Sequence, residues 1–461
     1  MSRPARDATP RIRGLRWTLW AGAAVLVVVT VVAAGIAIVK GRDASAAAED
    51  RLIQQITSRS LDLAGTDPAV SALLAVAASQ RWPDDVRTRS ALLGVVAAGI
   101  EDDPASLPIG GPDAYALTGI DPSGAYLVTG SRAARDADAD DRRPLTVWDV
   151  RTGTAVVDLT TFTDPDPART QAFVAAAEWI GPGRLFLVFD DPQTGGEHYA
   201  LYDVAHGIAT KAVLADPVQW FFTATGGRLY GLIPIDPAAG RYRLARYDRE
   251  TLRRVGDPIE LDIAPSSVSA TSDGTRIVVT GWADAAPHWR TRVYDAAGRL
   301  LAEGLDGTTR TVVAGPRVIA ADRSGLLSLT LGLAPRGTLA ADPASSVHLS
   351  VDDAGRTLVT TAGETVSVRD VPSGRELGPP IHVPDLAAPS VIDADGGGFT
   401  LSGALGVRYV TLEPAAQAAA ACRIAGRELS RAEWETFLSD LGPWHPLCSD
   451  VLATPEAGAA D

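Results

Sequence analysis

Hydrophobic and polar positions along this chain follow two different periods. Between residues 44 and 100 apolar residues recur every three or four positions, as on one face of a helix. Asp67 before Pro68 fits a helix start, so we expect a short α-helical segment over 44–100. From 114 to 412 the pattern changes to short alternating or apolar runs separated by Gly- and Asp-rich turns, which predicts β-strands.

Five of the predicted strands end in the same way. Each is an apolar or β-branched run, then an aromatic residue or Arg, then Asp, and four of the five have a Gly three or four residues later. An Asp side chain can cap a tight turn, and Gly accepts the positive φ that such a turn requires. The segments are LTVWDVRTG (145–153), ALYDVAHG (200–207), ARYDRETL (245–252), RVYDAAG (292–298) and SVRDVPSG (367–374). We interpret their aspartates as turn caps: Asp149, Asp203, Asp248, Asp295 and Asp370.

Repetition at a period of about 40–50 residues is typical of β-propellers. We therefore expect an all-β fold over 114–412, a β-propeller of about seven four-stranded blades. Seven Gly-containing turns, from DPSG (121–124) to DADG (393–396), are expected to follow the first inner strand of each blade. Segments such as 125–129, 185–189 and 276–280, taken as inner-strand segments, are apolar or Thr-rich. On this interpretation few polar residues converge at the central channel.

An uncharged run of 23 residues, 17–39, precedes the helical segment. At about 1.5 Å per residue it is long enough to span a hydrocarbon core of about 30 Å. The basic tail 1–16 carries five Arg, and the positive-inside rule places it in the cytoplasm and the body outside the membrane. The alternatives are a signal peptide cleaved near Ala44-Ser45-Ala46 and a buried soluble helix. The run is longer than the roughly 7–15 apolar residues of a signal peptide, which favours a single-pass anchor.

The net charge of the chain bears on whether it binds nucleic acid. The 461 residues carry a formal net charge of −14, although the first sixteen residues are basic. An acidic body repels phosphates, so we do not expect a nucleic-acid partner.

A second helical region, 415–450, is expected to cap the propeller at its C-terminal end. Ser430 and Glu433 have the spacing of a capping box. The two cysteines of the chain, Cys422 and Cys448, lie on either side of this helix, and outside the membrane they are expected to form a disulfide. Two buried free thiols, a zinc site with His445 and a Cys–His nucleophile pair are the alternatives.

Three parts of the sequence together resemble a known group of proteins. They are the segment RSLDLAGTDPAVSALLAVAASQRWPDDVRTRSALLGVV (59–96), the blades with Trp148-Asp149, and the ending ACRIAGRELSRAEWETFL…C. The chain is similar to the C-terminal half of actinobacterial WD40-repeat proteins, in which this half often follows a STAND-type NTPase or a kinase. The resemblance implies a sensing or protein-docking propeller. The chain has no G-x-x-x-x-G-K-[ST] loop, so nucleotide hydrolysis is not carried over.

The remaining motifs assign no catalytic, cofactor-binding or metal-ligating residue. Asp136, Asp138 and Asp140 are interpreted as a solvated loop rather than a calcium site, because Gly and Glu are missing at the EF-hand positions. Trp282 and Trp289 flank a Pro-containing loop and are the candidate edge for binding a partner, since aromatic residues are enriched in binding hot spots.

Taken together, these patterns predict a monomeric, membrane-anchored propeller outside the cytoplasm that binds a protein or senses a ligand without catalysis. The alternative is a propeller enzyme of the hydrolase or lactonase type that acts at the central channel.

Overall fold

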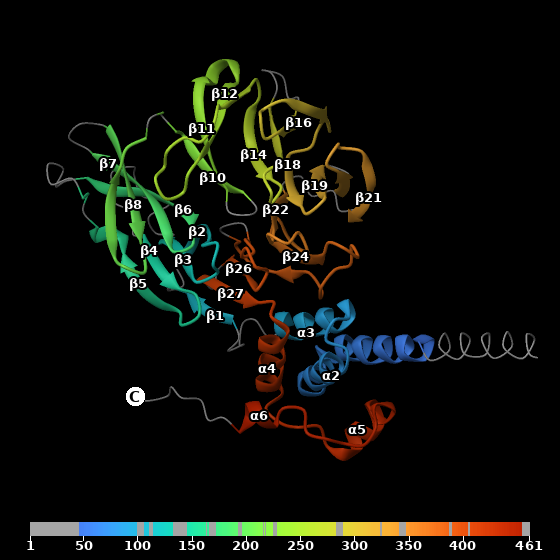
Figure 1. Ribbon diagram of the computed structural model, residues 1–461. Coiled ribbons are helices and arrows are strands. Elements are labelled where there is room, and N and C mark those ends of the chain that lie inside the picture. Colours follow the sequence, from blue (N-terminus) through green and yellow to red (C-terminus); the bar gives the residue numbers. More distant parts are fainter. Residues whose placement is uncertain are drawn as a thin grey trace, which may run out of the picture.

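The computed structural model places sheets around a central axis, with a group of helices beside the outer edge of the ring (Figure 1). These helices lie next to β1 (Ser106–Ile109), β24 (Thr365–Asp370), β26 (Gly398–Gly403) and β27 (Gly406–Thr411). Fifteen stretches of the chain are described. They are residues 46–98, 106–109, 114–131, 145–162, 164–165, 172–191, 196–214, 216, 218–224, 228–282, 289–322, 325–340, 347–386, 390–403 and 406–453.

Six sheets have four antiparallel strands, and within each sheet neighbouring strands are consecutive in the chain. The first two sheets are β2 (Ala114–Ile120), β3 (Tyr126–Ser131), β4 (Thr146–Asp149), β5 (Thr154–Asp158), and β6 (Phe173–Gly181), β7 (Arg184–Asp191), β8 (Gly196–Asp203), β9 (Ile208–Ala212). The next two are β10 (Trp220–Ala224), β11 (Arg228–Asp236), β12 (Arg241–Tyr247), β13 (Ile259–Leu261), and β14 (Ala264–Ala270), β15 (Arg276–Trp282), β16 (Trp289–Asp295), β17 (Leu300–Gly304). The last two are β18 (Arg310–Ala314), β19 (Arg317–Asp322), β20 (Gly325–Thr330), β21 (Pro335–Ala340), and β22 (Val347–Val351), β23 (Thr357–Ala362), β24 (Thr365–Asp370), β25 (Ile381–His382).

A three-stranded sheet lies between the last and the first of these six. It contains β26 (Gly398–Gly403), β27 (Gly406–Thr411) and β1 (Ser106–Ile109), and Ser106 lies opposite Val410 in the β1–β27 register. On the inner side of β26, residues 391–393 form one bridge, Ile392 to Phe399, before the chain turns. The expectation of seven four-stranded blades is therefore wrong: six sheets have four strands, because the inner segment of the remaining sheet is too short to form a strand.

The second strand of each four-stranded sheet is buried on both faces because it packs between neighbouring sheets. In β15 the five residues Ile277–Gly281 are all buried, and in β23 the same holds for Thr357–Thr361. Strands that are buried on both faces have nearly continuous apolar or Thr-rich sequences. This explains the composition of 185–189 and 276–280, which belong to β7 and β15 and do not line the centre of the ring.

The repeated Asp stands at the end of the third strand of its sheet in all five motifs, on β4, β8, β16 and β24 or directly after β12. Each carboxylate accepts a hydrogen bond from a backbone N–H of its own turn. The N···O distances are 2.8 Å for Arg151 to Asp149, 3.1 Å for His206 to Asp203, 2.8 Å for Thr251 to Asp248, 3.0 Å for Ala297 to Asp295 and 3.0 Å for Ser373 to Asp370.

One of these turns, and the corresponding turn of the fifth sheet, have a leucine with positive φ. The motif without Gly places Leu252 at a φ of 51°, and in the fifth sheet Leu333 has a φ of 64°. Left-handed backbone costs a residue with a Cβ roughly 1 kcal/mol, and both leucine side chains are buried, which offsets that cost. In the fifth sheet Thr330 takes the place of the missing Asp, since its hydroxyl accepts a hydrogen bond from the N–H of Ala334 at 3.1 Å.

The helices form one unit built from both ends of the chain. The N-terminal part contains a helix over 46–63, α2 (Pro68–Arg81) and α3 (Val86–Ala98), and the C-terminal part contains α4 (Pro414–Ala425), α5 (Arg431–Phe437) and α6 (Ser449–Leu452). Short 3-10 turns occur at η2 (Leu159–Thr161), η4 (Pro237–Ala239) and η5 (Ser439–Leu441). The expected caps are present: Asp67 accepts a hydrogen bond from the Val70 N–H, and Ser430 and Glu433 form the capping box.

One apolar core joins the two halves of this helical unit. Leu73 and Leu74 of α2 share it with Ala421 of α4, Trp434 of α5 and the buried disulfide between Cys422 and Cys448. The predicted disulfide is therefore confirmed, with its two Cα atoms 5.5 Å apart. A bonded pair of cysteines cannot also ligate zinc or act as a nucleophile, so those two alternatives are wrong.

A second core joins the helices to the ring. Leu93 and Val96 of α3 and Ala420 of α4 pack with Phe399 of β26 and Val366 of β24. At the closest approach Gly94 faces residues 378–379, and a Cβ at this position would collide with Leu61. The helical unit is thereby packed firmly against the sheets that close the ring (Figure 1).

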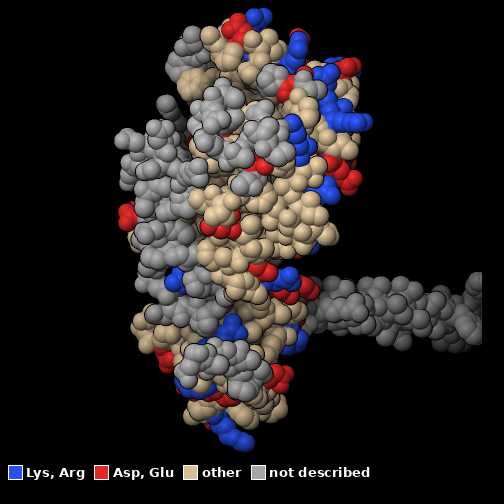
Figure 2. Space-filling model, turned by 90° about the vertical axis from the view of Figure 1, so that its left-hand side faces the viewer, with Lys and Arg blue, Asp and Glu red and all other residues tan. Residues whose placement is uncertain are grey.

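Acidic and basic side chains are interspersed over the described part of the face shown in Figure 2. Ion pairs occur at the surface of the protein, for example Arg254 with Asp216 at 3.0 Å and Arg427 with Glu433 at 2.8 Å. Exposed pairs contribute about 0–1 kcal/mol each, so the stability of the fold rests on the apolar cores.

Within the described stretches, no helix is both long and apolar enough to cross a bilayer. The predicted anchor, 17–39, and the basic tail, 1–16, lie outside those stretches.

Candidate functional site

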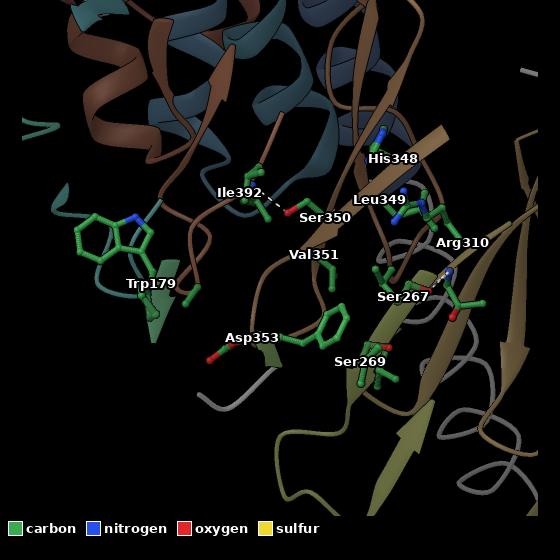
Figure 3. Close-up of a pocket in the computed structure, with 18 of the residues that line it drawn as sticks. Trp179, Ser267, Ser269, Arg310, His348, Leu349, Ser350, Val351, Asp353 and Ile392 are labelled. Atoms are coloured by element: carbon green, nitrogen blue, oxygen red, sulfur yellow. Dashed lines mark hydrogen bonds between the residues drawn. The ribbon is translucent and has the colours of Figure 1, made fainter. Parts of the chain in front are cut away.

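A cavity of about 570 Å³ occupies the centre of the ring (Figure 3). It is lined by residues of the first strand of each four-stranded sheet and by the segment 391–394 beside β26. All six four-stranded sheets therefore contribute to its wall. Its volume lies in the range of about 300–1,000 Å³ that is usual for small-molecule sites.

The lining includes charged and polar side chains that the strand pattern does not place at the channel. They are Glu178 on β6, Ser266, Ser267 and Ser269 on β14, Arg310 on β18, His348 on β22 and Asp353 after β22. The segments taken as inner strands were second strands, so the expectation of a channel without converging polar groups is wrong. The Gly-containing turns mark the channel-lining residues in the sequence, because the segment that precedes each of these turns lines the channel.

Glu178, on β6, is one of two acidic side chains in the described lining of the cavity. Its Oε2 accepts a hydrogen bond from the backbone N–H of Phe221 at 3.3 Å. The side chain touches the cavity but is otherwise surrounded by protein, and this burial raises the pKa of Glu178 to about 7. At neutral pH the carboxyl is therefore close to half protonated.

Arg310 and His348 lie together at the end where the inner strands begin (Figure 3). The Arg310 Nη1 donates a hydrogen bond to the carbonyl oxygen of Ser266 at 2.8 Å. Burial lowers the pKa of Arg310, and burial together with the nearby positive charge of Arg310 lowers the pKa of His348. At neutral pH this end of the channel therefore holds a charged guanidinium next to a neutral imidazole.

Asp353 lies at the opposite end, near Trp179 (Figure 3). Its backbone N–H donates to the carbonyl oxygen of Ala394 at 2.7 Å, which ties the turn after β22 to the next sheet. Arg249 is close enough for the charge of Asp353 to raise its pKa, against the larger effect of burial. The two ends of the channel thus differ: the charge of Asp353 acts on Arg249 at one end, whereas burial alone shifts the pKa of Arg310 at the other.

Replacing Glu178 by Gln is expected to stabilise the fold at high pH only. The pKa of Glu178 in the folded state, about 7, lies above the value of 4.5 that is usual for a glutamate in water. The folded state therefore holds more protons between these two values, and its stability falls as pH rises through them. Gln mimics the protonated form. We expect the free energy of unfolding of Glu178→Gln, measured with urea, to equal that of the wild type at pH 4.5–5. At pH 8 we expect it to be about 1–3 kcal/mol higher than that of the wild type.

The matched control for this prediction is Glu435→Gln on the exposed surface of α5. The free energy of unfolding of this variant is expected to stay within about 0.5 kcal/mol of the wild-type value at both pH values. Equal differences for Glu178→Gln at both pH values would contradict the prediction.

Trp282 and Trp289 form a cross-strand pair at the end of the β15–β16 hairpin. Their ring centroids are 4.4 Å apart, and Trp282 is 37% exposed. Ala264, the first residue of β14, lies opposite Trp282, so the pair is on the face of the ring where the inner strands begin. Arg310, which also begins its strand, is on this face too.

The other candidates do not converge. His445 packs edge-on against Trp434, with ring centroids 4.6 Å apart, outside the channel. Asp136, Asp138 and Asp140 lie outside the described residues. Among residues with a described position, no three acidic, histidine or cysteine side chains are grouped to hold a metal ion.

Known proteins show weak similarity to this chain, at the level of structure. No protein-family model matches the sequence, and no curated protein matches it. Among solved structures, the chain is similar to Kuenenia stuttgartiensis hydrazine synthase, with a TM-score of 0.43 and 13% identity over 66% of this chain and 97% of that chain. It is also similar to a chain of the mitotic checkpoint complex, with a TM-score of 0.44 and 13% identity over 67% and 90% of the two chains. The sheets of this chain themselves show a β-propeller, and its resemblance to actinobacterial WD40-repeat proteins stays a prediction.

Proposed function

We propose that this protein is a membrane-anchored propeller that binds a protein partner outside the cytoplasm and does not catalyse a reaction. The observation that carries the proposal is the Trp282–Trp289 pair, which presents aromatic surface at the end of a hairpin held in a closed ring. Tryptophan is enriched in binding hot spots, and a rigid surface loses little entropy on binding. The uncharged run 17–39 supports the anchor, and the basic tail 1–16 supports its orientation.

The test is photo-crosslinking of the full-length protein in intact cells, with the crosslinker at a surface position beside the hairpin. A docked partner is expected to be captured by the wild type and to fall at least tenfold in Trp282→Ala/Trp289→Ala, because loss of two hot-spot residues costs about 2 kcal/mol or more. Protease protection of the tail in sealed vesicles tests the orientation of the anchor.

Ile208→Ala is the control for capture, since Ile208 is 59% exposed on the outer strand of another sheet. Capture of the same partner is expected to be unchanged in this variant. Capture that is equal in the wild type and the double tryptophan variant would reject the hairpin as the docking edge.

One observation favours the alternative, a hydrolase or lactonase that acts at the channel. Glu178, His348 and Asp353 all line the same cavity. That function requires turnover of an ester or lactone by the purified protein, which the scaffold proposal excludes.

A further inference from the structure

The end of the channel around Arg310 combines features of an anion-binding site. Arg310 is half-buried, and one of its two terminal nitrogens is held by the Ser266 carbonyl oxygen. This contact orients the guanidinium, and Arg has five N–H donors in all. The neighbouring wall carries the imidazole of His348 and the hydroxyl of Ser267, which accepts a hydrogen bond from the Thr311 N–H at 3.4 Å.

The charge of Arg310 is not balanced by a carboxylate within the described part of the chain. The ion pairs there leave Arg310 out, and burial alone shifts its pKa. Glu178 and Asp353 line other parts of the cavity, and the charge of Asp353 acts on Arg249 instead. Since burying an unpaired charge is costly, an anionic ligand at Arg310 would recover part of that cost.

The wall beyond Arg310 carries apolar side chains among the serines of β14 and β22. Phe222, Val268, Val312 and Leu349 line the cavity between Arg310 and its far end. We propose that the channel binds a small organic carboxylate, with its carboxylate group on Arg310 and Ser267 and its apolar body against Phe222, Val268 and Val312. This site is separate from the Trp282–Trp289 edge and does not depend on a docked partner.

Charge favours a monoanion over a phosphate. His348 is neutral at neutral pH, so Arg310 supplies one positive charge at this end of the channel. A phosphate monoester carries about −1.5 to −2 at pH 7 and would bring excess negative charge into a cavity that also holds Glu178 and Asp353. A carboxylate matches the single guanidinium in charge and can accept two parallel hydrogen bonds from it.

The test is isothermal titration of the full-length protein in detergent with three probes: hexanoate, 3-phenylpropanoate and hexan-1-ol. Both carboxylates are expected to bind with Kd values below about 1 mM, and hexan-1-ol at least tenfold more weakly. Arg310→Gln is expected to weaken carboxylate binding at least tenfold, and Arg310→Lys to a smaller extent, because it keeps the charge but loses the fork. Arg243→Gln, at an exposed pair with Glu260, is the control and is expected to bind as the wild type does.

A second measurement does not depend on the folding of a variant. A diazirine-bearing carboxylate is expected to label the wild-type protein on β10, β14 or β18. The proposal is overturned if neither carboxylate binds with a Kd below about 1 mM. It is also overturned if Arg310→Gln binds equally well, if hexyl phosphate binds more tightly than hexanoate, or if the label lies outside the channel. None of these results bears on the crosslinking at the tryptophan pair, so the two proposals fail separately.

Discussion

Replacing Phe399 by Ala is expected to lower the free energy of unfolding by about 3–5 kcal/mol. Phe399 is fully buried on β26, where it packs in one core with Leu93 and Val96 of α3 and Val410 of β27. Its removal would leave a cavity between the helical unit and the sheet that closes the ring. Urea unfolding followed by both far-ultraviolet circular dichroism and tryptophan fluorescence is the appropriate measurement.

Phe162→Ala is the matched control. Phe162 is half-buried and contacts Tyr202 edge-on, with ring centroids 5.0 Å apart, so its loss is expected to cost less than half as much. Because the core around Phe399 belongs to both the ring and the helical unit, both probes should shift together in Phe399→Ala. A loss below 1 kcal/mol, or a shift in one probe alone, would show that this core does not couple the two parts.

Replacing Cys422 and Cys448 together by Ala is expected to cost about 3.5 kcal/mol in the chain-entropy account of a bond whose cysteines are 26 residues apart. Both cysteines are almost completely buried in the core of the helical unit, so substitution is a cleaner test than added reductant. The measurement is urea unfolding of the double variant and of the wild type under oxidising conditions.

Ser430→Ala is the control in the same unit. It removes one side of the capping box and is expected to cost about 1 kcal/mol. A second contact closes the same loop as the disulfide: Glu428 accepts hydrogen bonds from the backbone N–H groups of Leu447 and Cys448 at 2.7 and 2.8 Å. If the double Ala variant unfolds at the same urea concentration as the wild type, the Glu428 contact is sufficient and the disulfide contributes little.

Local features of the fold could be predicted from the sequence because they depend on neighbouring residues. The Asp-capped turns, the Asp67 helix start and the capping box at Ser430 all follow from the geometry of a few consecutive residues. The disulfide was predictable because the chain has two cysteines and one region that brings them together.

The channel could not be predicted in the same way. The second strands contain the most regular apolar runs because they are buried on both faces. The apolar pattern therefore points to them, and not to the first strands, as the inner strands. The true inner strands include RTVVA with Arg310 and VHLSV with His348. Some of their residues pack in the apolar cores and others line the cavity, so their sequences mix apolar and polar residues. Arg310, His348 and Glu178 line one cavity because the ring closes. Ring closure depends on all the sheets together and cannot be predicted from any single segment.

The pairing of β1 with β27 has a consequence for synthesis of the protein. β1 is synthesised early, but its partner β27 is the last of the described strands to be made. The helices of 46–98 are likewise uncovered until α4 has been synthesised. Contacts between distant segments form late because loop closure precedes them. A nascent chain that stops before residue 406 would expose both an unpaired strand and the apolar surface of α2. Chaperones and proteases could use that surface to distinguish unfinished chains from complete ones.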